Sequence, residues 1–439
     1  MSKLTAIMFP LAFAVSAPAY AQDAAPIRLS LDDAIARGLS ASHRVAEGTA
    51  RQDAADAAAG ARHAATMPQV TALAGYTRTN HVQEFTIPLS PLQSGVLYPD
   101  APDNYRARLD AQWPLYTGGR LDALADAAQK DAAASAADVD ALRTDLRFEI
   151  TRAYWALFLA DESLRVFDES LERARRQAVD AQNQLDAGLV PPSDVLSARA
   201  QESRQQMLRI QAGTTRISAE AELARLVGLQ PGAAIQPDGS AAQDQAAAPY
   251  SALLARALEQ RQDRRALVVR LAGAESREKA AAAGRTPTVA LAGGIDYANP
   301  NPKIFPRQER WRNTWDASVN VSWALFDGGK TKADAAEAAA SKRAIQARID
   351  ELDSMVALDI RRRLAERDAS RAAIDAAQAG FTAATEAYRV LGDRFRAGVA
   401  TITDLLTAQV AVTQASLDRT QATVSSYIVD AGLRRALGE

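Results

Sequence analysis

The hexapeptide LYTGGR at residues 115–120 recurs as LFDGGK at residues 325–330, an offset of 210 residues. At the same offset, the segment LDAGLVPPSDVLSARA, which begins at Leu185, matches FRAGVATITDLLTAQV, which begins at Phe395. Similarity at a fixed spacing over such a span is the signature of a duplicated architecture. The chain is therefore predicted to be a tandem duplication.

The duplication divides the chain into two repeats, 22–228 and 250–439. Between them, residues 229–249 are rich in proline, glycine, glutamine and alanine, a composition typical of a linker. An additional match further upstream has a larger offset, which places one longer loop in the first repeat, between residues 77 and 104. Each repeat is expected to fold into the same set of elements.

Residues 1–21 have the pattern of a secretory signal peptide. Lys3 supplies a positive start, an apolar stretch follows from Leu4 to Val15, and Ala19-Tyr20-Ala21 gives a small-x-small cleavage site. The alternative is a membrane anchor, but this apolar run is too short to span a hydrocarbon core of ~30 Å. The chain is therefore predicted to be exported.

Composition narrows the class of protein further. The formal net charge is −2 and no basic stripe occurs, which argues against nucleic-acid binding. The absence of cysteine excludes disulfides and thiolate metal sites. Alanine-rich runs favour helices but bury little apolar area per residue, so long and thin helical packing is expected rather than a thick globular core.

Each repeat contains a predicted β-hairpin, at about 68–116 and 287–326, in which apolar and polar residues alternate. Strands of ~10 residues with aromatic residues near their ends are typical of an outer-membrane barrel. A soluble sandwich would show the same alternation. Four strands cannot close a membrane barrel, and an open edge in lipid leaves backbone groups unsatisfied. If the strands cross a membrane, several chains must share one barrel.

Each hairpin is followed by a long helical hairpin, at 119–228 and 329–437. The first long helix, up to Ala187, contains no proline and no internal glycine, and it would be roughly 100 Å long at 1.5 Å per residue. Shorter helices are expected before each β-hairpin, near residues 31–65 and 253–283. Left-handed caps are expected at Gly188 and Gly398, and N-caps of the returning helices at Ser193 and Thr403.

This order of elements resembles the TolC-type outer-membrane efflux protein family over essentially the whole mature chain. The motifs that carry the resemblance are WPLYTGGR and WALFDGGK at the strand-to-helix junctions, and DAGLVPPSDVLSAR and RAGVATITDLLTAQ at the helical reversals. It implies an α+β membrane protein, a homotrimer that shares a 12-stranded outer-membrane β-barrel above a periplasmic α-helical barrel. It also implies a passive exit channel that works with a periplasmic adaptor protein and an inner-membrane efflux pump or ABC exporter.

The resemblance further implies that the helical reversals close the periplasmic end of the channel. Asp194 and Asp404 match acidic positions that narrow the pore, and in a trimer they would form a negative ring able to bind a divalent ion. Alternatively, each aspartate stabilises the first turn of its helix. Phe395 matches a constricting tyrosine, whereas Ala400 and Thr407 depart from the family's locking arginine and second acidic ring. The reversal tips, expected to dock the adaptor, are marked by Gly188, Gly398, Leu196 and Leu406.

Residues 324–331 nearly match a phosphate-binding loop, with alanine in place of the first glycine. The preceding strand alternates, whereas nucleotide folds use doubly buried parallel strands. The first repeat also has Arg120 and Leu121 where the motif needs lysine and threonine. The glycines are instead predicted to turn each strand into its helix, at Gly118, Gly119, Gly328 and Gly329.

No constellation of catalytic residues is apparent. The three histidines, His43, His63 and His81, lack ligand spacing, and neither an acid–base pair nor a serine nucleophile elbow can be nominated. We therefore expect no enzyme activity, cofactor or metal site. The alternative to a channel is a soluble periplasmic coiled-coil scaffold or adaptor, which would lack the full duplication.

Overall fold

The computed structural model describes residues 26–90, 93–239 and 248–439. The predicted signal peptide at 1–21 lies outside the described residues, as does part of the predicted linker. The chain divides into two compact units. We call the first the strand unit, made of residues 39–149, 243–380 and 422–439. The other, the tip unit, comprises residues up to 38, 150–242 and 381–421.

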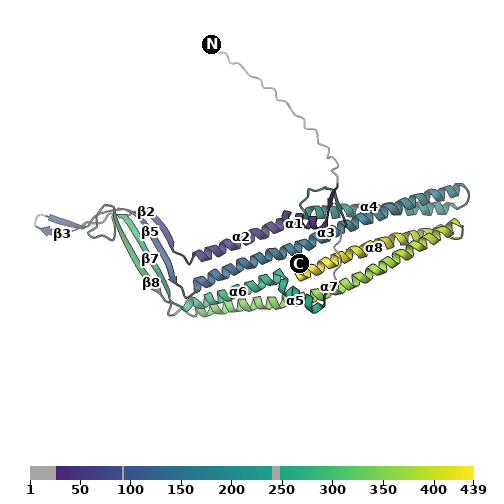
Figure 1. The fold of residues 1–439 in the computed structure, drawn as a ribbon. Helices are drawn as coiled ribbons and strands as arrows, with labels where there is room; N and C mark the ends of the chain where they lie inside the picture. Colours follow the sequence, from purple (N-terminus) through teal and green to yellow (C-terminus); the bar gives the residue numbers. More distant parts are fainter. Residues whose placement is uncertain (1–25, 91–92, 240–247) are drawn as a thin grey trace, which may run out of the picture. The chain divides into compact units, whose positions relative to one another are not determined.

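The strand unit contains a four-stranded antiparallel sheet whose order is β2-β5-β7-β8 (Figure 1). The strands are β2 (Gln69–Arg78), β5 (Asp103–Tyr116), β7 (Thr288–Asn299) and β8 (Arg312–Ser322). The pairing of β5 with β7 joins the two repeats, with Leu109 opposite Ile295. In the described part of the chain, β2 and β8 each pair on one side only, so the sheet has two open edges.

Two details of the strands differ from the sequence-based expectation. The long loop of the first repeat contains a hairpin of its own, β3 (Phe85–Ser90) and β4 (Gln93–Tyr98). The second alternating segment ends earlier than the pattern indicated, because β8 stops at Ser322 and Trp323 and Leu325 lie beyond it. Alternation of apolar residues therefore continued past the last hydrogen-bonded residue of the strand.

The helices of the strand unit come from both repeats. They are α2 (His43–Ala64), α5 (Tyr250–Gln260), α6 (Gln262–Ala282), and parts of α3 (Arg120–Asp186), α7 (Lys330–Arg396) and α8 (Ile402–Leu437). A short 3-10 helix, Ala283–Arg285, follows α6. The apolar core of this unit lies where α5, α7 and the end of α8 meet, and includes Leu253, Val356, Ile360 and Leu433.

Each of the two short helices expected before the β-hairpins is in fact a pair of helices. In the first repeat, α1 (Leu31–Ala41) ends before Ser42, whose side chain accepts the backbone N–H of Val45 at 3.3 Å and caps α2. In the second, Arg261 separates α5 from α6 with an extended backbone, ψ 122°. A serine can compete for backbone hydrogen bonds in this way, whereas Arg261 carries no such local signal.

The tip unit holds the rest of the long helices and α4 (Pro192–Leu226). A short parallel pair of strands, β1 (Ile27–Leu29) and β6 (Ile235–Pro237), lies against α3. Here the buried Tyr154 hydroxyl accepts the backbone N–H groups of Asp238 and Gly239 at 3.1 and 3.3 Å. The predicted linker thus contains a short strand, which its composition did not indicate.

Candidate functional site

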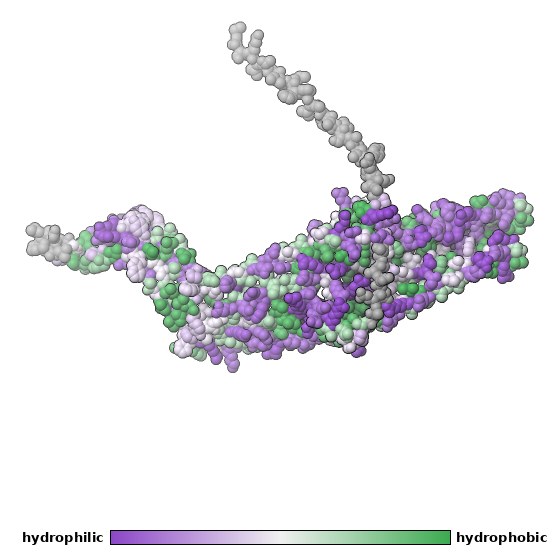
Figure 2. All heavy atoms as spheres, viewed as in Figure 1, coloured by the Kyte–Doolittle hydropathy of each residue, from purple (hydrophilic) through white to green (hydrophobic). Residues whose placement is uncertain are grey.

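The sheet of the strand unit has one apolar and one polar face. Residues that lie opposite each other in the register share a face, so the register shows which face of the sheet carries each side chain. The large apolar side chains of one face are 41–78% exposed: Val70, Tyr76, Tyr105, Leu109, Trp113, Leu291, Ile295, Tyr297, Trp315, Val319 and Val321. Green patches lie over this sheet in Figure 2. An exposed apolar surface of this extent is unusual for a soluble protein and suits contact with lipid.

Aromatic side chains gather at the end of the sheet that carries the loops. Tyr76 and Tyr105 have ring centroids 5.0 Å apart, and Trp311 stacks on Tyr297 with centroids at 4.8 Å. Trp113 lies toward the other end of β5, near the start of α3. Aromatic residues at both ends of the strands mark the two interfaces of a membrane barrel.

The opposite face carries a cluster of ionic side chains. Asp296 on β7, whose side chain is only 2% exposed, accepts Arg106 Nε at 2.6 Å and also pairs with Arg108. Arg108 donates to Asp110 at 2.6 Å and to Asp316 at 3.1 Å. The cluster therefore links three strands from both repeats. The alternation in the sequence predicted a polar face for each hairpin but not this cluster, because no local pattern shows which strands are neighbours.

Gly294 makes room for this ionic cluster. It lies opposite Asp110 on one side and Asp316 on the other. A Cβ atom at Gly294 would lie 2.8 Å from an Arg108 guanidinium nitrogen and 2.9 Å from Asp110 Oδ1. Glycine in a strand interior often marks such a close approach. The cluster therefore depends on a glycine in the backbone of β7 as well as on its ionic side chains.

The two helical reversals lie in the tip unit and have the same geometry. Gly188 and Gly398 have φ values of 72° and 73°, in the left-handed region that glycine adopts without strain. In each reversal, the backbone N–H groups of the glycine and of the residue after it donate to carbonyl groups in the last turn of the helix. In the first reversal, the Leu189 N–H donates to the Gln184 carbonyl oxygen at 2.8 Å. This is the Schellman arrangement, which satisfies the last carbonyl groups of a helix.

The acidic residues after the two reversals have different surroundings. Asp404 and Thr401 form a reciprocal cap: Thr401 Oγ1 accepts the Asp404 N–H at 3.2 Å, and the Asp404 carboxylate accepts the Thr401 N–H at 3.0 Å. The Thr401 hydroxyl, which also donates to this carboxylate, lowers the pKa of Asp404. In the first repeat, Pro191 takes the capping position without a side-chain bond, and among the described residues the Asp194 carboxylate accepts only the Ser193 hydroxyl, at 3.3 Å. The N-caps expected at Ser193 and Thr403 are therefore wrong by two residues.

The two tips pack together through a small apolar cluster. Its buried members are Ala178, Ala181, Val195, Ala198 and Ile402. Phe395 and Leu406 pack against it and are half-buried, whereas Leu196, the counterpart of Leu406, is 64% exposed. Leu189 and Val399, which follow the two glycines, are 76% and 62% exposed. The tips thus present apolar side chains to solvent.

The glycines at the strand-to-helix turns all have positive φ. The values are 64° and 79° at Gly118 and Gly119, and 64° and 91° at Gly328 and Gly329. In the second turn the Asp327 carboxylate accepts the N–H groups of Gly329 and Thr331, both at 2.9 Å. The Thr331 hydroxyl, followed by these two backbone bonds, lowers the pKa of Asp327 to about 2. The chain's own carboxylate therefore occupies the place near the helix N-terminus where a nucleotide phosphate would bind.

Comparison with known proteins agrees with this arrangement. The family model described as outer membrane efflux protein matches residues 34–229 and 253–439. The chain belongs to the outer membrane efflux protein family. Protein CyaE of Bordetella pertussis is 28% identical over 384 residues, 87% of this chain and 78% of CyaE. Outer membrane protein TolC of Vibrio cholerae is 24% identical over 395 residues, covering 89% of this chain and 86% of TolC.

The fold is that of solved outer-membrane channels. The structure of outer membrane protein VceC from Vibrio cholerae matches 93% of this chain and 96% of its own, with a TM-score of 0.76 and 21% identity. The predicted fold class, with duplicated helical hairpins and β-hairpins, is therefore confirmed. This member of the outer membrane efflux protein family is an outer-membrane channel for efflux or secretion that extends into the periplasm.

The alternative of a soluble scaffold is not favoured, because the exposed apolar face of the sheet would have no partner in water. Among the described residues, no helix combines the length and apolar character needed to cross a bilayer. The outer membrane efflux protein family is a family of channel and transport proteins.

Proposed function

We propose that the protein is the exit duct of a multi-part export system and that it works as a homotrimer. The observation that carries this proposal is the open four-stranded sheet, with β2 and β8 as unpaired edges in the described chain. In lipid, an unpaired edge leaves backbone N–H and C=O groups without partners. Joining β8 of one chain to β2 of the next removes every edge, and three chains give twelve strands.

Cysteine cross-linking tests the shared barrel directly, because the chain has no cysteine of its own. Val70 on β2 and Val321 on β8 both lie on the apolar face, near the ends of their strands that join helices. A double variant, Val70→Cys with Val321→Cys, should form covalent trimers under oxidising conditions. If β2 and β8 of neighbouring chains pair in a different register, a cysteine at a neighbouring position on β8, such as Val319→Cys, should form the cross-link instead.

The matched control places both cysteines within one chain. Leu109 and Ile295 are directly opposite on β5 and β7. Leu109→Cys with Ile295→Cys should therefore give only the monomer on a denaturing gel. A native membrane extract in which every β2–β8 pair also stays monomeric would contradict the trimer.

We propose that the helical reversals dock a periplasmic adaptor, which connects the duct to an inner-membrane pump or ABC exporter. The support is the exposed apolar set at the tips, which includes Leu189, Leu196 and Val399. Leu196→Glu should abolish co-purification with the adaptor and stop export, because a buried charge in an apolar contact is costly. The matched change Met207→Glu, at an exposed α4 position away from the tip, should have no effect. Full export by the Leu196→Glu variant would contradict this docking site.

We also propose that Asp194 and Asp404 form an acidic ring at the periplasmic end of the trimer. Asp194 has no cationic partner in the described chain, and Asp404 is exposed although it caps α8. A ring of carboxylates favours cations and can hold a divalent ion. Phe395 packs against the apolar cluster of the tips. In the proposed gate it would therefore support the tip as well as line the pore.

Single-channel conductance tests the ring. Wild-type channels should be blocked by divalent cations from the periplasmic side, and Asp194→Asn with Asp404→Asn should lose most of this block. Asp186→Asn, which removes an exposed carboxylate just before the reversal, is the matched control. Unchanged divalent block in the double variant would contradict the proposed gate.

A further inference from the structure

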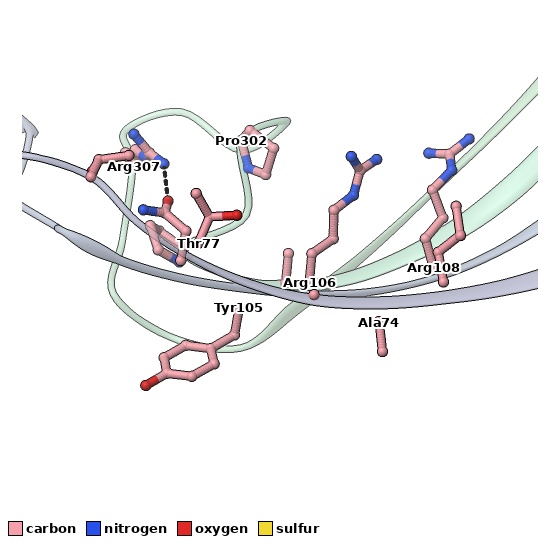
Figure 3. Close-up of a pocket in the computed structure, with 13 residues that line it drawn as sticks. Ala74, Thr77, Tyr105, Arg106, Arg108, Pro302 and Arg307 are labelled. Carbon is pink, nitrogen blue, oxygen red and sulfur yellow. Dashed lines mark hydrogen bonds between the residues drawn. The ribbon is translucent and has the colours of Figure 1, made fainter.

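A cavity of about 480 Å³ lies on the polar face of the sheet, between β2, β5 and the loop that follows β7. Its lining includes Arg106, Arg108 and Arg307 together with Leu73, Pro300 and Pro302. In Figure 3 the three arginine side chains project from one side of the strands, whereas Tyr105 and Ala74 point to the other side. The cavity therefore opens on the side of the sheet opposite its lipid-facing residues.

At this cavity the cationic side chains are exposed more than the carboxylate that pairs with them. None of its described lining residues is acidic. The Asp296 carboxylate, which pairs with Arg106 and Arg108, is 2% exposed, whereas the Arg106 side chain is 53% exposed. Arg106 donates to Asp296 through Nε and Nη2, which leaves its Nη1 without an acceptor in the described chain. The buried carboxylate thus holds Arg106 in place while part of its guanidinium group remains exposed at the cavity.

Arg307 adds a cation without a neighbouring carboxylate. Its Nη1 donates to the Tyr98 hydroxyl at 2.7 Å and its Nη2 to Asn104 Oδ1 at 2.8 Å, both neutral groups. It forms no ion pair with a described carboxylate, and its Nε is buried without an acceptor among the described residues. A guanidinium has five donors in a planar fork and stays charged. Arg307 can therefore take an anionic acceptor without losing an existing ion pair.

We propose that this cavity is a transient binding subsite for amphiphilic organic anions that leave through the lumen. A carboxylate or sulfonate would be bound by Arg106 and Arg307, because a guanidinium fork matches such groups in charge and geometry. The apolar part of the solute would contact Leu73 and the two prolines. A volume of about 480 Å³ is within the range of small-molecule sites. The inference rests on the proposed shared barrel, in which this polar face lines the lumen.

Conductance of the purified full-length channel in planar bilayers tests the inference. Octanesulfonate and octylammonium have the same tail and opposite charges, and each is added to the outer side below its micelle-forming concentration. Octanesulfonate should interrupt the current in a concentration-dependent manner, whereas octylammonium should not. The voltage dependence of the block should place the anion inside the pore rather than at the lipid surface.

Two pairs of variants locate the site. Arg307→Gln should weaken the octanesulfonate block about tenfold or more, the effect of losing one charge-assisted hydrogen bond. Arg310→Gln, which removes an exposed charge from the same loop outside the cavity, should not. Because Arg307 also holds the loops together, a second pair leaves it intact: Thr77→Asp places a carboxylate in the lining and should weaken the block, and the neutral Thr77→Asn should not.

The outcomes separate this inference from the channel function. Conducting channels that octanesulfonate does not block, or that octylammonium blocks equally well, would overturn the anion subsite alone. Equal block in Thr77→Asp and Thr77→Asn would also overturn it. Protein that opens no conductance at all would overturn the proposed duct and this inference with it.

Discussion

Replacing Gly118 with alanine should destabilise the protein more than the same change at Gly328, although the two glycines occupy equivalent places in the repeats. Both have a φ of 64°, so alanine costs about 1–2 kcal/mol at either position. Their surroundings differ. A Cβ atom at Gly118 would lie 1.7 Å from Thr286 Oγ1 and 2.6 Å from Thr286 Cβ, whereas nothing lies within 4 Å of one at Gly328.

The extra cost at Gly118 is that of forcing an atom into an occupied space, about 1–3 kcal/mol. We therefore expect Gly328→Ala to lose about 1–2 kcal/mol and Gly118→Ala about 2–5 kcal/mol of unfolding free energy. Urea unfolding of the detergent-solubilised protein, followed by far-ultraviolet circular dichroism, gives this comparison. The reduced chain entropy of alanine in the unfolded state is shared by both variants and cancels.

A double-mutant cycle assigns the difference to one contact. Thr286→Gly removes all three atoms near the added Cβ, so it should restore most of the extra loss in the Gly118→Ala background. A coupling near zero, or equal losses at Gly118 and Gly328, would refute the argument that Thr286 sets the difference between the repeats.

Two further changes follow from hydrogen bonds described above. Tyr154→Phe should cost about 1–3 kcal/mol in the same unfolding assay, because two backbone N–H groups beside a buried ring lose their acceptor; an unchanged midpoint would mean that water replaces the hydroxyl. The pKa of Asp327 is lowered from its usual 3.8 to about 2, so its stabilisation relative to Asp327→Asn should be complete above pH 4 and disappear as the pH falls toward 2. A stability difference that stays constant over this pH range would contradict that role for the carboxylate.

Much of the fold follows from local patterns in the sequence. A stretch without proline or internal glycine was expected to form one helix up to Ala187, and α3 runs from Arg120 to Asp186. Alternation identified the strands because one face meets lipid and the other does not. The reversal glycines were found because a left-handed residue is needed where a helix turns back, and few other residues adopt that conformation.

The features that were missed depend on contacts between distant parts of the chain. Asp296 looks like an ordinary polar strand residue until β7 is placed beside β5, where it meets Arg106 and Arg108. Strand β6 was hidden because its three residues lie within a proline- and glycine-rich segment and form a strand by pairing with β1, which is distant in the sequence. The cap of α8 was assigned to the wrong residue, since Thr401 and Thr403 have the same chemistry and only the backbone decides between them.

The two unpaired edges of the sheet have a consequence for biogenesis. Before the subunits assemble, a newly exported chain has exposed strand edges and an exposed apolar face, and both are prone to aggregate in water. In the proposed trimer, we expect such a subunit to depend on a chaperone until it reaches lipid, and the yield of assembled channel to depend on the concentration of subunits. In the proposed trimer, a copy damaged at one edge would still join through the other and disable intact copies, so mutations in β8 should be dominant over the normal gene.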